Sequence, residues 1–140
     1  MKLADLNVAI GILAGMKLFR IADKKTRNAL VNDYGELRPH FKKVRDDAEE
    51  IRTKFQADWD EELDAVQAFR SKGKPVVGHD AYLEAETDAN KAISDLYLAE
   101  VKVNISPVKK DDFLAHCAGV ADDLTMEQLF FLEDCGIIVS

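Results

Sequence analysis

The stretch LVNDYGELRPHFKKVRDDAEEIRTKF, residues 30–55, decides the fold of this chain of 140 residues. Its apolar residues recur at alternating steps of four and three, which is the heptad spacing of a helix that packs along one side. The residues of this seam are Leu30, Tyr34, Leu37, Phe41, Val44, Ala48, Ile51 and Phe55. After a stutter at Trp59 the seam continues, so the spacing predicts one long helix, or two nearly collinear helices, over about residues 20–70.

Pro39 lies inside this seam and lacks the N–H that would bond to the carbonyl of Gly35. Because the apolar spacing keeps its phase on both sides of Pro39, we expect a kinked helix rather than a loop. A seam of about 40 residues is longer than a return helix of about 18 residues can cover, which favours an oligomer. The seam residues predicted to carry oligomerisation are Leu37, Phe41, Val44, Ile51 and Phe55.

The predicted long helix is polarised in charge. Residues 17–45 hold nine Lys or Arg and three Asp or Glu, whereas residues 46–70 hold three and nine. Such blocks are typical of solvated faces, and the alternative is that the basic half of one copy pairs with the acidic half of a second. The whole chain has a net charge of −7, which argues against direct binding to nucleic acid.

The segments beside the long helix complete a mainly α fold. A buried helix is predicted over Leu3–Ala14, and its apolar run is too short to span a membrane. Gly73, Pro75 and Gly78 break the chain after residue 70, and Asp80 begins a return helix that ends near Leu98. Its packing face is predicted to hold Leu83, Ala89, Ile93, Leu96 and Tyr97. We therefore expect a single domain, with a helical hairpin and an N-terminal helix in residues 1–98.

Residues 99–140 are predicted to form a small α+β element of one short strand and two short helices. Val101, Val103 and Ile105 alternate with polar residues, which is typical of a strand that is buried on one face. Its partner would be residues 76–77, residues 137–139 or another subunit. One helix is expected from Asp111 or Asp112 to Gly119, and a second between a Thr125–Gln128 capping box and Gly136.

Acidic residues are densest around Trp59, and the return helix of an antiparallel hairpin adds three more. The predicted partner-binding set is Asp58, Asp60, Glu61, Glu62 and Asp64 with Glu84, Glu86 and Asp88. The set is either plain solvated surface, a site for a basic partner, or a site for a divalent cation. The spacing matches no EF-hand or other metal motif, so we predict no metal and no cofactor.

The sequence offers little for catalysis. His116 and Cys117 are neighbours, but adjacent helix positions point about 100° apart, so the histidine does not face the thiol. There is no glycine-rich phosphate loop, nucleophile elbow or zinc pattern. Cys117 and Cys135 lack CxxC spacing and are expected to be reduced in a cytoplasm. We therefore expect no enzyme.

Three short motifs resemble those of small uncharacterised proteins encoded by tailed phages and prophages. They are Met16-Lys17-Leu18 before the long helix, Leu37-Arg38-Pro39 within it, and residues 100–105 (EVKVNI) before a short helix that contains leucine. The resemblance implies a phage context, in the host cytoplasm or the virion, and carries no catalytic residues.

Two functions remain open. The first is a non-enzymatic protein that associates with itself or with another phage or host protein, as an assembly, connector or chaperone component. The second is an acidic inhibitor of a host defence or nucleic-acid enzyme, in which the carboxylates stand in for phosphates.

Overall fold

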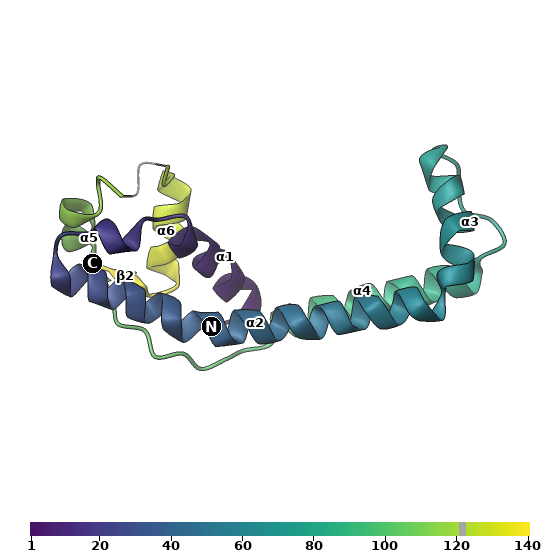
Figure 1. Ribbon diagram of the computed structural model, residues 1–140, viewed down its shortest axis with the longest axis horizontal. Helices are drawn as coiled ribbons and strands as arrows, with labels where there is room; N and C mark the ends of the chain where they lie inside the picture. The colour runs from purple at the N-terminus through teal and green to yellow at the C-terminus, as the bar shows by residue number, and fades with distance from the viewer. Residues whose placement is uncertain (121–122) are drawn as a thin grey trace. The chain divides into compact units, whose positions relative to one another are not determined.

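A computed structural model describes residues 1–120 and 123–140, and it confirms the mainly α fold (Figure 1). The helices are α1 (Leu3–Ala14), the short 3-10 helix η1 (Leu18–Arg20), α2 (Lys24–Asp58), α3 (Asp60–Ser71), α4 (Asp80–Leu98), α5 (Lys110–His116) and α6 (Met126–Asp134), and the strands are β1 (Val108–Lys109) and β2 (Ile138–Val139). The chain divides into two compact units. Unit 1 comprises Met1–Lys43 and Ala99–Ser140, and unit 2 comprises Val44–Leu98. One boundary between the two units lies inside α2, between Lys43 and Val44. From the sequence we expected the internal boundary only after residue 98.

Unit 1 is built around α1, the first part of α2 and the C-terminal element. The bounds of α1 and its buried face are confirmed, because Leu3, Leu6, Ile10 and Leu13 are all buried. Strand β1 pairs in parallel with β2, and the N–H of Val108 donates to the carbonyl of Ile137 at 2.9 Å. Other side chains that lose nearly all solvent contact in this core are Ile21, Leu30, Leu37, Leu132, Ile137 and Ile138.

The strand predicted at Val101, Val103 and Ile105 is wrong. Those three residues are half-buried between exposed polar neighbours, as the alternation predicts, but residues 101–107 carry no strand. The ladder forms instead at β1, directly after Pro107, whereas Val101 pairs with the N-terminus: its N–H donates to the carbonyl of Met1 at 2.9 Å. The predicted terminal partner, residues 137–139, does supply the second strand.

Both C-terminal helices are present. Helix α5 begins at Lys110, with Asp111 and Asp112 in its first turn. The capping box before α6 is confirmed: the Thr125 hydroxyl accepts from the N–H of Gln128 at 3.1 Å, and the Thr125 N–H donates to the Gln128 side chain at 2.9 Å. Gly136 follows α6 with a φ of 81°, a conformation that favours glycine and stops the helix.

Helix α2 runs through Pro39, so the helix expected there in place of a loop is confirmed, and the expected kink stays a prediction. The expectation of one helix, or two nearly collinear ones, to residue 70 is wrong at Trp59. This residue leaves the helical conformation, with φ −124° and ψ 20°, and in Figure 1 α3 turns away from α2. The stutter in the seam marks this break. Asp60, Glu61 and Glu62 then lie in the first turn of α3, where the helix dipole favours negative charge.

Unit 2 is a hairpin in which α4 returns alongside the second part of α2 (Figure 1). The deepest side chain of α4 is Tyr82, only 1% exposed. Its ring centroid lies 5.2 Å from that of Phe55 and 5.9 Å from that of Trp59. The expected face residues Leu83, Ala89, Ile93, Leu96 and Tyr97 are half-buried. Tyr82 was not among the predicted face residues, although it lies seven residues before Ala89 and so on the same face of α4.

Candidate functional site

The seam residues predicted to carry oligomerisation have unequal exposure within one chain. Leu37 is 0% exposed and Val44 is 3% exposed, so both are buried in the monomer. Phe41, Ile51 and Phe55 are half-buried, and Phe55 contacts Tyr82. Leu37 and Val44 therefore offer almost no surface to a second copy in this conformation. Oligomerisation through the seam stays a prediction that would rest on the three half-buried residues.

Two of the eight predicted partner-binding carboxylates are engaged inside unit 2. Glu86 accepts two hydrogen bonds from the Arg70 guanidinium, at 2.6 and 2.9 Å, and this contact lowers the pKa of Glu86. Glu62 lies 3.0 Å from Nδ1 of His79. The exposed members of the set are Asp58, Asp60, Glu61, Asp64, Glu84 and Asp88. Among the described residues, no group of three or more His, Cys, Asp or Glu side chains is placed to hold a metal ion.

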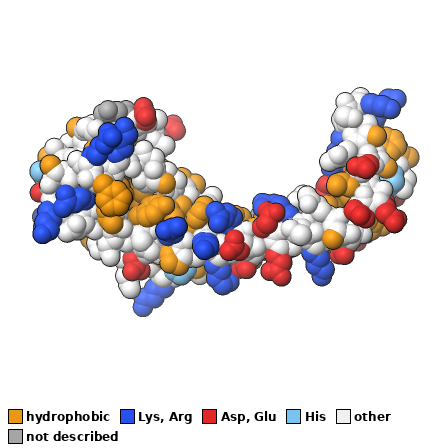
Figure 2. Space-filling view, in the orientation of Figure 1, with side chains coloured by type: hydrophobic (Ala, Val, Ile, Leu, Met, Phe, Trp, Pro, Cys, Tyr) orange, Lys and Arg blue, Asp and Glu red, His pale blue; other side chains and the backbone are white. Residues whose placement is uncertain are grey.

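A surface that the sequence analysis did not single out lies at the end of α1. It is a groove of about 440 Å³ on unit 1, lined mostly by apolar side chains. The lining residues are Leu13, Ala14, Met16, Lys17, Leu18, Phe19, Arg20, Val31 and Tyr34. We call it the Phe19 groove, because Phe19 is 85% exposed, the most exposed of the large apolar residues described. In Figure 2, apolar side chains gather on this unit with Lys and Arg side chains beside them.

The local fold holds Phe19 outward. Leu18 and Ile21 on either side of it are buried, at 8% and 1% exposure, and they anchor the segment in the core. Backbone hydrogen bonds fix the turn: the N–H of Arg20 donates to the carbonyl of Lys17 at 2.9 Å, and that of Ile21 to the carbonyl of Leu18 at 3.2 Å. The exposure of Phe19 is thus a property of a tightly bonded turn and not of a loose loop.

The charge around the Phe19 groove is positive. Lys17 and Arg20 line it and are exposed, and its lining contains no acid. Asp23 is occupied in capping α2: its Oδ2 accepts from the N–H and the hydroxyl of Thr26 at 2.9 and 2.7 Å, which lowers its pKa. Asp33 is fully buried. Neither carboxylate lines the groove, where the charged residues are Lys17 and Arg20.

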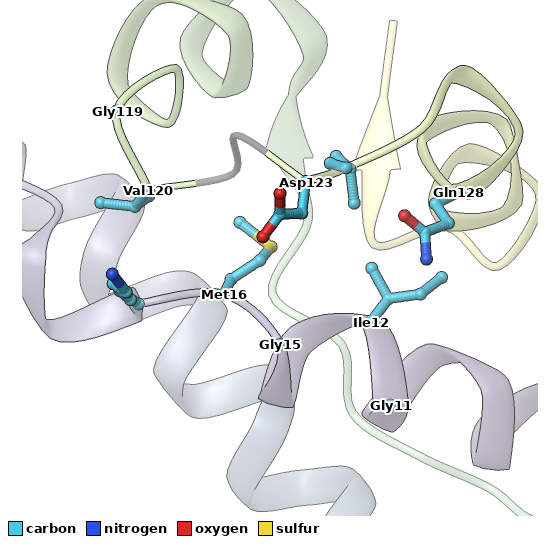
Figure 3. A pocket seen from close by; sticks show the side chains of 10 residues that line it. Gly11, Ile12, Gly15, Met16, Gly119, Val120, Asp123 and Gln128 are labelled. Carbon is cyan, nitrogen blue, oxygen red and sulfur yellow. The ribbon is translucent and has the colours of Figure 1, made fainter.

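A second depression of unit 1 is smaller and more polar (Figure 3). Its volume is about 170 Å³, and the side chains of Asp123 and Gln128 point into it above Ile12 and Met16. It borders residues 121–122, which lie outside the described part of the chain. It therefore carries no assignment.

The two thiols are poorly suited to nucleophilic chemistry. Burial raises the pKa of Cys117 and that of Cys135 to about 11 each, so both stay protonated near neutral pH. The neighbouring His116 is exposed, and its Nε2 lies 4.0 Å from Oδ1 of Asp23.

No protein-family model, curated protein or solved structure matches the chain. Among the described helices, none combines the length and the apolar character that crossing a bilayer requires. The candidate site is the Phe19 groove, with its exposed aromatic ring and two exposed basic residues. A sequence signal for it does exist, namely an aromatic residue between two bases in the segment Lys17-Leu18-Phe19-Arg20.

Proposed function

We propose that this protein acts without catalysis, by binding other protein chains. The observation that carries the proposal is the Phe19 groove, where an almost fully exposed aromatic ring stands beside an apolar hollow. Exposed apolar surface of this kind marks interaction sites on folded proteins. Together with the resemblance to phage proteins, it favours an assembly, connector or chaperone component that works in the host cytoplasm or the virion.

Self-association is the first form of this function to test. Apolar contacts through Phe41, Ile51 and Phe55 would survive high salt, since salt screens charges and not apolar contacts. We expect light scattering after size exclusion to give a discrete oligomer at low and high salt. Ile51→Glu is expected to lower the mass, whereas Lys54→Glu, an exposed position on the same helix, leaves it unchanged. A wild-type monomer at both salt concentrations would contradict self-association.

The acidic inhibitor is the second candidate, and the six exposed carboxylates of unit 2 favour it. Binding to a labelled peptide rich in arginine and lysine is expected to weaken as salt rises. Reversing Glu61 and Asp64 to Lys should weaken that binding by about tenfold, because both are exposed and the affinity would be electrostatic. Reversing the exposed Glu127 of unit 1 serves as the control. Equal binding by all variants would contradict the inhibitor.

A further inference from the structure

We infer that the Phe19 groove receives a segment of a different protein in which apolar side chains are flanked by carboxylates. This inference rests on the proposed function, since it names the class of partner that the exposed surface of unit 1 takes. Its two parts, the apolar contact and the acidic flank, follow from different observations.

The apolar part follows from the walls of the groove. Leu13, Met16 and Leu18 are buried and form its base, while Val31 and Tyr34 of α2 are half-buried along it. Phe19 stands exposed in the lining, so a ligand that enters the groove covers one face of the ring. Aromatic residues that become buried in this way dominate the energetics of protein interfaces.

The acidic part follows from the charges in the lining of the groove. Lys17 and Arg20 lie in the lining of the groove, and the lining contains no carboxylate. A ligand with basic flanks would meet uncompensated like charge. A ligand with acidic flanks gains attraction and is steered to the groove from a distance.

A second copy of this chain fits the groove less well. Two grooves facing each other would bring Lys17 and Arg20 of one copy against those of the other, because a twofold contact uses the same patch twice. In the described residues of unit 2, the large apolar side chains that are exposed are Val77 and Leu98. Val77 follows Lys72 and Lys74, so that loop brings positive charge with its apolar side chain.

Leu98 has acidic neighbours, but they are already paired within the chain. Asp95 bonds to Lys91 at 3.0 Å, and Glu100 lies 3.1 Å from the N-terminal amine.

Unit 1 also exposes Leu114, Met126 and Phe130, and the exposed Glu127 lies next to Met126. A copy that offered these side chains to the groove would bind head to tail, and such a contact ends in a ring or a filament. Because a head-to-tail contact that does not close into a ring gives a filament, we assign the groove to another protein, and binding of a second copy is an outcome of the test that overturns this assignment.

The test is a selection from a random peptide library of about 12 residues, long enough for three helical turns. Peptides are selected on the full-length protein and compared with those retained by Phe19→Ala. We expect the enriched peptides to be rich in Leu or aromatic residues and in Asp or Glu. Phe19→Ala and the pair Lys17→Glu with Arg20→Glu should each weaken binding by about tenfold or more. Val77→Ala, an exposed apolar position in unit 2, is the matched control.

The outcomes separate this inference from the proposed function. Enriched peptides that are basic, or that bind Phe19→Ala as tightly as they bind the wild type, overturn the inference. The proposed function then stands, because the protein still binds other chains through another surface. An oligomer that Phe19→Ala dissociates also overturns it, since the occupant is then a second copy. A wild-type monomer that enriches no peptide at all overturns both.

Discussion

Asp33→Asn is expected to stabilise the protein by about 2 kcal/mol above pH 7 and to leave its stability nearly unchanged at pH 5. The carboxyl of Asp33 is 0% exposed on α2. Its Oδ1 accepts from the N–H of Ser106 at 2.6 Å, and its Oδ2 has no partner within the described residues. Burial raises the pKa of Asp33 from 3.8 to about 7, the charge of Glu36 adds to this, and the Ser106 hydrogen bond opposes it.

The sign follows from proton binding. Between about pH 4 and 7 the folded state holds a proton on Asp33 that the unfolded chain has lost, so stability falls as pH rises through this window. The difference between 3.8 and about 7 corresponds to about 4 kcal/mol of penalty once Asp33 is charged. Asn keeps the acceptor for Ser106 and carries no charge, but its unpartnered amide N–H costs about 1–2 kcal/mol, hence the smaller net gain.

Urea unfolding of the wild type and Asp33→Asn at pH 5 and pH 8 measures this difference. Other groups titrate equally in both proteins, so the variant isolates Asp33. Asp58→Asn, an exposed carboxylate, is the control and should shift stability by no more than about 0.5 kcal/mol. A variant that is less stable than the wild type at pH 8 would mean that the buried carboxylate anchors the chain at Ser106 as a net stabilising contact.

Tyr82→Ala is expected to destabilise unit 2 by about 3–5 kcal/mol. The ring is 1% exposed and contacts Phe55 of α2 and Trp59 at the start of α3, so its removal leaves a cavity where three helices meet. Trp59 is the single tryptophan of the chain, and its fluorescence therefore reports on this unit directly.

Chemical unfolding followed at Trp59 checks the prediction. Tyr82→Phe keeps the ring contacts and should cost no more than about 1 kcal/mol, because it loses only the hydroxyl. Tyr97→Ala, a half-buried tyrosine further along α4, should cost clearly less than Tyr82→Ala. Equal losses for the two alanine variants would show that the aromatic cluster does not hold the unit together.

Much of the fold could be predicted, because periodicity and caps are local signals. The spacing of apolar residues predicted α1, the passage of α2 through Pro39 and the return helix α4, and the Thr125 capping box predicted the start of α6. The break at Trp59 showed in the sequence only as a stutter. At the break Trp59 contacts Tyr82 of α4, a tertiary contact that spacing does not reveal.

The site could be predicted less well, because exposure and pairing depend on the folded chain. Buried seam residues such as Leu37 and half-buried ones such as Ile51 have the same spacing, and only the structure separates them. The pairing of Glu86 with Arg70 joins two helices across a loop. The sequence does not distinguish Phe19 from its apolar neighbours, whereas in the structure Leu18 and Ile21 are buried and Phe19 is exposed.

Docking at the Phe19 groove is tested most directly by mapping the residues that a selected peptide contacts. Titration of the ¹⁵N-labelled protein with that peptide, followed by amide chemical shifts, locates the contact residue by residue. We expect the largest chemical-shift changes at Met16, Lys17, Phe19 and Arg20, and smaller changes at Val31 and Tyr34. Shifts concentrated in Val44–Leu98, with Phe19 and its neighbours unmoved, would contradict it.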